Sequence, residues 1–203
     1  MLTPPDGRRD GGKLAYLTDT KRRWNAPDEG LFNLLKYATG CPDRRCISEL
    51  QRQQLIPRAI YFETLLCDNA SERRVYIARA EARFAEADLV FFDPDNGLEV
   101  PSVPKGRKNS SKYVCYDEVE AFFRSGKSVL IYKHFPFEKR GPFISRVSAT
   151  LAKRSGADII RVFRTPHVAL FMAAQRRHRR LADVPLDRLG ALKVCDAGES
   201  GLP

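Results

Sequence analysis

The residues best suited to chemistry form a short polar turn directly after an apolar run, Asp93-Pro94-Asp95-Asn96-Gly97. Pro94 fixes its own φ angle, and Gly97 permits a backbone bend that a side chain would obstruct. Because of these constraints, the turn can direct the side chains of Asp93, Asp95 and Asn96 toward a common point. Each of these residue types is also common in turns without a function, so a purely structural turn is the alternative interpretation.

A second polar pair, Lys133 and His134, follows another apolar run. In open α/β sheets, ligands bind at the edge where the carboxyl ends of the parallel strands meet, so we expect both groups at one edge. His134 could act as a general base, or it could be an ordinary loop residue. The predicted catalytic residues are Asp93, Asp95, Asn96 and His134.

Two chemistries fit this set of side chains. The carboxylates of Asp93, Asp95 and Glu99 could hold Mg²⁺ or Mn²⁺ through oxygen ligands, as in enzymes that cleave phosphodiesters. Alternatively, Asp93 and Asn96 could orient an exocyclic amino group of a nucleobase for methyl transfer, which needs mainly positioning. The sequence leaves both chemistries open.

The charge of the chain predicts a polyanionic partner. Thirty-five Lys and Arg residues against 25 Asp and Glu residues give a formal net charge of +10, and the cations are clustered. Such a surface attracts nucleic acid through counterion release, although a solvated basic surface without a ligand has the same composition. The predicted nucleic-acid contacts are Lys105, Arg107, Lys108, Lys133, Arg176, Arg177, Arg179 and Arg180.

The two apolar runs, residues 87–93 and 127–133, do not alternate with polar residues. This pattern is typical of strands that are buried on both faces of a parallel sheet. Strands at residues 158–164 and 167–173 are separated by two residues only, too few for a crossover, so they must form an antiparallel hairpin. Amphipathic helices are expected at residues 73–87, 116–126 and 142–155.

Alternating strands and helices predict an α/β fold with right-handed crossovers. We expect a Rossmann-like, class I methyltransferase-like domain over residues 1–181, with a mostly parallel sheet, helices on both faces and a C-terminal antiparallel hairpin. Residues 182–203 are expected to form a loosely ordered tail.

Length and composition limit the class of protein. A chain of 203 residues with 43% hydrophobic residues suits a single globular domain. The five cysteines are odd in number and scattered, which argues against a disulfide framework or a zinc site. No run of eighteen apolar residues and no apolar leader is present, so we expect a cytoplasmic protein without a membrane segment.

Three blocks, residues 87–99, 111–119 and 128–135, resemble a family of uncharacterised bacterial and phage-borne proteins. More distantly, the apolar strand that ends in Asp93-Pro94 is similar to the D-P-P-[YF] motif of class I S-adenosylmethionine-dependent methyltransferases, which holds the target nitrogen. Asp95 replaces the second proline of that motif, and Asn96 replaces its aromatic residue. The glycine-rich loop that lies against S-adenosylmethionine in those enzymes has no clear counterpart before residue 85.

The resemblance implies S-adenosylmethionine as the cofactor and a methyltransferase-like protein that acts on or binds DNA or RNA. Two alternatives stay open. One is a metal-dependent nuclease or phosphoesterase, and the other is a non-catalytic, basic nucleic-acid-binding protein with a degenerate site.

Overall fold

The computed structural model describes residues 3–4, 15–18, 29–41, 46–54, 56–183 and 193–196. The chain divides into two compact units, where the sequence predicts one domain over residues 1–181. One unit comprises residues 4–63, and the other comprises residues 64–203 together with residues 1–3. The larger unit contains the whole sheet and every predicted site residue, so it holds the candidate site.

The smaller unit is helical where it is described. It contains a 3₁₀ helix, η2 (Ala15–Thr18), and two α-helices, α1 (Glu29–Thr39) and α2 (Ile47–Arg52). Helix α1 buries Leu34 and Ala38, which lie four residues apart and therefore on one face. None of the helices in the described residues is long and apolar enough to cross a membrane.

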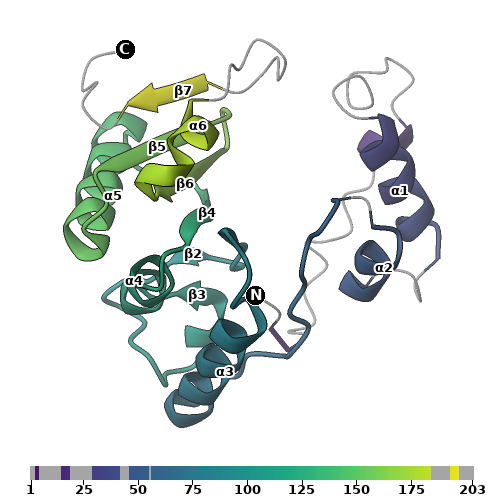
Figure 1. The fold of residues 1–203 in the computed structure, drawn as a ribbon, viewed down its shortest axis with the longest axis horizontal. Helices are drawn as coiled ribbons and strands as arrows, with labels where there is room; N and C mark the ends of the chain where they lie inside the picture. The colour runs from purple at the N-terminus through teal and green to yellow at the C-terminus, as the bar shows by residue number, and fades with distance from the viewer. Residues whose placement is uncertain are drawn as a thin grey trace. The chain divides into compact units, whose positions relative to one another are not determined.

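The larger unit is built on a five-stranded sheet in the order β1-β4-β6-β5-β7. Strands β4, β5, β6 and β7 are labelled in Figure 1. Strands β1 and β4 are parallel, whereas β6 is antiparallel to β4 and to β5, and β7 is antiparallel to β5. The five strands are β1 (Leu89–Phe92), β4 (Ser128–His134), β5 (Ile159–Arg164), β6 (Val168–Ala174) and β7 (Lys193–Asp196). Two short parallel strands, β2 (Gly97–Leu98) and β3 (Tyr113–Val114), form a separate ladder.

The predicted Rossmann-like, mostly parallel sheet is therefore wrong. Only the β1–β4 pairing of the main sheet is parallel, because the hairpin inserts β6 between β4 and β5. The hairpin itself was correctly located, since its two strands are joined by too short a link for any other pairing. In the described residues no strand precedes β1, and β7 comes from the segment that was predicted to be a loose tail.

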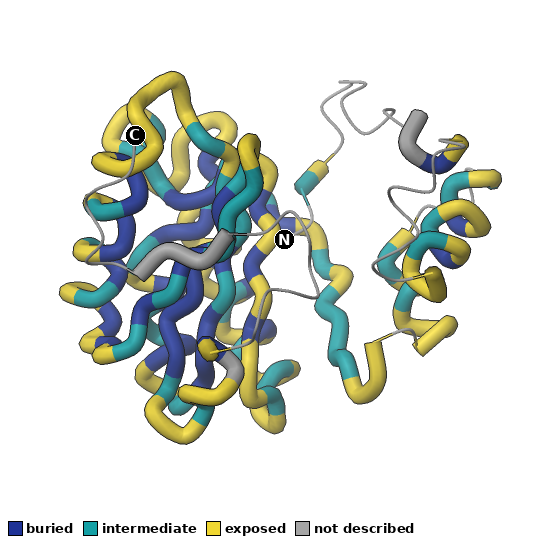
Figure 2. Tube along the Cα trace, turned by 90° about the horizontal axis from the view of Figure 1, so that it is seen from above, coloured by how far each residue is buried: buried dark blue, intermediate teal, exposed yellow. Residues whose placement is uncertain are grey.

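Helices α4 (Tyr116–Arg124) and α5 (Arg140–Ser155) cover one face of the sheet, where Phe122 packs on Phe92 and Phe143 on Phe171. On the other face, the described helix is the single turn α6 (Arg179–Ala182), which packs through Ala182 on Met172. Figure 2 shows buried residues along the strands and on the sheet side of the helices. The two faces are therefore covered unequally.

A second prediction is also wrong. The first apolar run, residues 87–93, is predicted to be buried on both faces, but the strand that it forms is buried on one face. Val90 and Phe92 are 4% and 5% exposed, whereas Leu89 and Phe91 are 39% and 53% exposed. Strand β1 lies at an edge of the sheet, and the described helices cover one of its faces only. An uninterrupted apolar sequence does not distinguish this arrangement from two-sided burial.

A buried ion pair joins three segments of the larger unit. The guanidinium of Arg73, on helix α3 (Ala70–Arg83), donates to both carboxylate oxygens of Glu118 on α4, at 2.5 and 2.7 Å. It also donates to the backbone oxygens of Ser110 and Tyr113. Glu118 in turn accepts a hydrogen bond from the backbone N–H of Cys115, so all polar groups of the pair are satisfied. Arg73 is 1% exposed, and Glu118 is 4% exposed.

Replacing Arg73 with Met should lower the free energy of unfolding by about 3–5 kcal/mol, because the Glu118 carboxylate would stay buried without its partner. Urea denaturation measures this loss. Arg124→Met is the matched control, since Arg124 forms an ion pair with Glu120 while 71% exposed, and its loss should cost no more than about 0.5 kcal/mol. Equal effects of the two substitutions would contradict a stabilising role for the buried pair.

Candidate functional site

The acidic turn, residues 93–97, and the end of β4 lie together at one end of the strands, as the sequence predicts. We call this end of the sheet, where β1 and β4 have their carboxyl ends, the site edge. Because β1 and β4 are parallel, their carboxyl ends lie side by side, with Phe92 paired to Ile131. The Nζ atom of Lys133 donates a 2.6 Å hydrogen bond to the backbone oxygen of Asn96, which joins the two strand ends directly.

Gly97 is required for this contact. It has a φ of +82°, and a Cβ atom at this position would lie 2.1 Å from Cδ of Lys133. The lysine side chain therefore crosses the turn at the point where a side chain is missing. Burial and then the positive charge of Arg146 lower the pKa of Lys133. Lys133, predicted as a nucleic-acid contact, thus holds the acidic turn in place.

Asp93 lies beside two aromatic side chains of β4, Tyr132 and His134. The Tyr132 hydroxyl and Nε2 of His134 are 3.2 Å apart, and the two rings are nearly perpendicular, with centroids separated by 5.1 Å. Asp93 follows the Phe92–Ile131 pair by one residue, which places it next to Tyr132. The sequence reasoning missed Tyr132, although its two-residue spacing from His134 is the signal for one shared face of a strand.

Asp93 reaches solvent, but the surrounding protein excludes part of its hydration, and this raises the pKa of its carboxyl. The charge of Asp95 raises this pKa further, whereas His134 lowers it. Withdrawal from water and the nearby Asp93 also raise the pKa of the Tyr132 hydroxyl. The three groups are therefore coupled electrostatically and suit proton transfer better than isolated side chains would.

Of the three carboxylates predicted to bind Mg²⁺ or Mn²⁺, those of Asp95 and Glu99 accept hydrogen bonds from different parts of the chain. Oδ2 of Asp95 accepts a 2.9 Å hydrogen bond from the Thr3 hydroxyl, and Oε1 of Glu99 accepts one of 2.9 Å from the backbone N–H of Tyr116 at the start of α4. Within the described residues, no three His, Cys, Asp or Glu side chains are grouped so that they could hold a metal ion. Asp93, Asp95 and Glu99 thus do not form a ligand set.

The basic loop between β2 and β3 lies against the acidic turn, because the backbone N–H of Asn96 donates to the Lys112 oxygen at 2.8 Å. Nζ of Lys105 is 2.6 Å from a carboxylate oxygen of Asp117, so this cation is already paired. Arg107 and Lys108 are exposed, and neither has a carboxylate partner among the described residues.

The Asp68 carboxylate fixes this basic loop. Its two oxygens accept hydrogen bonds of 2.8 Å from the backbone N–H groups of Asn109 and Ser111. The loop that carries Arg107 and Lys108 therefore has a defined backbone on which two cations are presented.

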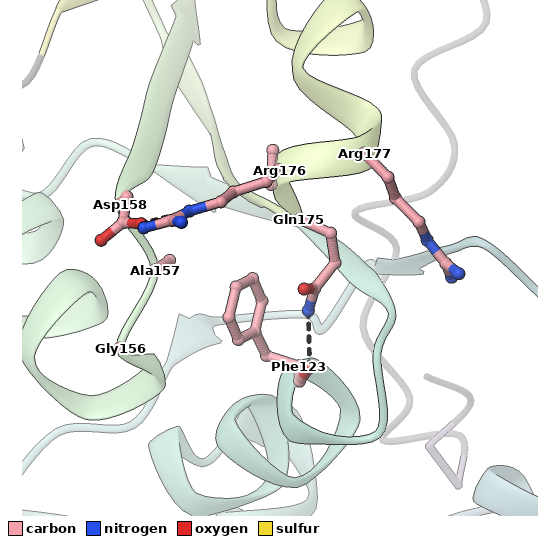
Figure 3. A pocket seen from close by; sticks show the side chains of 8 residues that line it. Phe123, Gly156, Ala157, Asp158, Gln175, Arg176 and Arg177 are labelled. Carbon is pink, nitrogen blue, oxygen red and sulfur yellow. Dashed lines mark hydrogen bonds and ion pairs between the residues drawn. The ribbon is translucent and has the colours of Figure 1, made fainter.

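The second predicted cationic cluster comprises Arg176, Arg177, Arg179 and Arg180. It follows the end of β6, which lies beside the start of β4 and therefore at the opposite end of the strands from the site edge. Figure 3 shows Arg176 paired with Asp158 beside a pocket of about 330 Å³, and Gln175 donating to the backbone oxygen of Phe123. Arg177 donates to the backbone oxygen of Gly126 at 3.0 Å. Strand β4, with seven residues, separates the two edges by roughly 20 Å.

Arg179 and Arg180 follow in α6, and both are exposed. Arg179 is 4.0 Å from Asp183. The structure thus divides the predicted nucleic-acid contacts between two distant edges.

An open hollow of about 710 Å³ lies next to His134 at the site edge. It is lined by residues 135–139, which link β4 to α5, by Arg140 at the start of α5, and by Pro166 and His167 of the hairpin turn. A hydrogen bond of 3.2 Å from the Phe135 N–H to the His167 oxygen joins these two segments.

Comparisons of this chain with protein-family models, with curated proteins and with solved structures found no match. A glycine-rich loop after a strand, which S-adenosylmethionine would need in a methyltransferase of class I, is not found among the described residues before β1.

Asp93→Asn should change how stability depends on pH. An acid with a raised pKa binds its proton more tightly in the folded state, so the wild type loses stability as pH rises above about 3.9, the unfolded value. The variant lacks this loss. We expect its melting temperature to match the wild type near pH 3 and to exceed it at pH 7, measured by thermal denaturation across this range. A constant difference at all pH values would contradict the raised pKa.

Proposed function

We propose that this protein binds nucleic acid through cations at the site edge of the sheet. The observation that carries the proposal is the arrangement of Arg107, Lys108, Lys139 and Arg140. All four are exposed, and none has a carboxylate partner in the part of the chain that the structure describes. They lie in the two segments that flank the acidic turn and the end of β4.

Phosphate contacts of this kind position a nucleic acid without reading its sequence. The net charge of +10 adds a long-range attraction for the same polyanion. The cluster at the opposite edge is a weaker candidate, because Arg176 and Arg177 already form ion pairs with Asp158 and Asp88.

Charge reversal by Arg107→Glu with Lys108→Glu should weaken binding of a labelled oligonucleotide, measured by fluorescence anisotropy between 50 and 200 mM salt. Two lost phosphate contacts should reduce the slope of log K against log salt by roughly 1.5. The control is Arg79→Glu with Lys153→Glu, two exposed helix residues whose reversal changes the net charge equally. Equal losses for both double variants would mean that only net charge matters. Parallel reversal of Arg179 and Arg180 tests the opposite edge.

Catalysis at the same edge is a second candidate function, favoured by the coupled group of Asp93, Tyr132 and His134. The candidate reactions are phosphodiester cleavage and methyl transfer. Support for the second is weaker, because the described residues supply neither the mostly parallel sheet nor the glycine-rich loop of a methyltransferase.

If the edge is catalytic, Asp93→Asn should abolish turnover at pH 7 without lowering the melting temperature. Cleavage of oligonucleotides is measured with Mg²⁺ and Mn²⁺, and methyl incorporation is measured with labelled S-adenosylmethionine. Calorimetric titration with S-adenosylhomocysteine tests the cofactor site directly. Asp88→Asn, an exposed carboxylate at the opposite edge, is the control. No turnover by the wild type in either assay would leave binding as the function.

We also infer a cytoplasmic location. It is supported by the thiols of Cys41, Cys67 and Cys115, which form no disulfide bond among the described residues. Free cysteines in this number are typical of proteins from a reducing compartment.

A further inference from the structure

Phe137 is the most exposed large hydrophobic residue described, with its side chain fully open to solvent at a relative accessibility of 114%. It lies in the link between β4 and α5, in the wall of the 710 Å³ hollow. A hydrogen bond of 2.8 Å from the Glu138 N–H to the Pro136 oxygen closes a tight turn around Phe137. The ring is thus presented outward by a defined backbone.

One end of this turn is anchored on the core through Phe135. The ring of Phe135 packs edge-on against Phe143 of α5, with centroids 5.8 Å apart, and the Phe135 N–H donates to His167. Phe143 is buried. An exposed aromatic ring on an anchored turn can bind a flat partner with little loss of conformational freedom.

The charge around the hollow is positive. The carboxylate of Glu138, which lines the hollow, forms an ion pair of 2.6 Å with Arg146, so its negative charge is neutralised. Lys139 and Arg140 follow directly, and the Arg140 guanidinium lies 5.4 Å from the centroid of the Phe135 ring. Two cations without a described carboxylate partner therefore stand beside one free aromatic face.

We propose that this hollow binds an unpaired base of single-stranded nucleic acid, with Phe137 stacking on the base and Lys139 and Arg140 contacting the adjacent phosphates. Base stacking on an aromatic ring combined with a basic track is the general mode of single-strand binding. The volume is within the range of about 300–1,000 Å³ for ligand pockets, and the hollow is open to solvent. A duplex keeps its bases stacked and cannot use Phe137 in this way. The inference rests on the proposed nucleic-acid binding and specifies its ligand.

Phe137→Ala should weaken binding of labelled oligo-dT and oligo-rU by roughly 5-fold to 100-fold, the range for one stacked base. It should leave the melting temperature unchanged because the side chain is fully exposed. Phe137→Trp should retain affinity, and its fluorescence should be quenched on binding. The control Val75→Ala removes an exposed apolar side chain from α3, where Val75 is 59% exposed. The pair of oligonucleotides shows whether the sugar matters.

An abasic strand of equal length and a duplex separate the two proposals. If base-containing strands bind more tightly than the abasic strand and the duplex, and Phe137→Ala removes the difference, the base site is supported. Equal affinity for all four ligands, with no effect of Phe137→Ala, would overturn the base site but leave nucleic-acid binding intact. Failure of every oligonucleotide to bind at 50 mM salt would overturn the proposed function itself.

Discussion

The larger unit depends on one buried guanidinium. Arg73 joins α3 to α4 through Glu118 and to the backbone around β3 through the oxygens of Ser110 and Tyr113. A buried charge is tolerated only when its partners satisfy it, so these three segments are held in one arrangement. The oxygen of neighbouring Lys112 then accepts the hydrogen bond from Asn96, which connects the ion pair to the acidic turn. The position of the turn is thus set by a residue on a different element.

Several charged residues at the two edges are engaged in holding the scaffold. Lys133 fixes the acidic turn, Lys105 pairs with Asp117, and Glu99 accepts the first N–H of α4. A charge engaged in this way is less available to a ligand, because the ligand must replace an existing partner. The exposed cations of the basic loop and of the β4–α5 link carry no such cost. The clustering of cations in the sequence therefore overstates the surface that is open to a polyanion.

Three features at the site edge complement one another. The basic loop and the β4–α5 link supply cations, Phe137 supplies an aromatic face, and Asp93, Tyr132 and His134 supply adjacent polar side chains. In the described residues, helices α4 and α5 cover one face of the sheet, and β1 exposes Leu89 and Phe91 on its other face. A strand bound at the hollow would pass near these groups.

The sequence by itself determined the positions of the main helices and strands, the hairpin and the composition of the acidic turn, because periodicity, capping and turn formation are local properties. It also predicted that the acidic turn lies beside the end of β4. The tertiary structure alone decided the strand order, the one-sided burial of β1, the pairing of Lys105, Arg176 and Arg177, and the position of Tyr132 beside Asp93. These features depend on partners far apart in the chain, such as Arg73 with Glu118 and Lys133 with Asn96, at separations of 45 and 37 residues. Residue patterns within a short window of the sequence cannot predict such contacts.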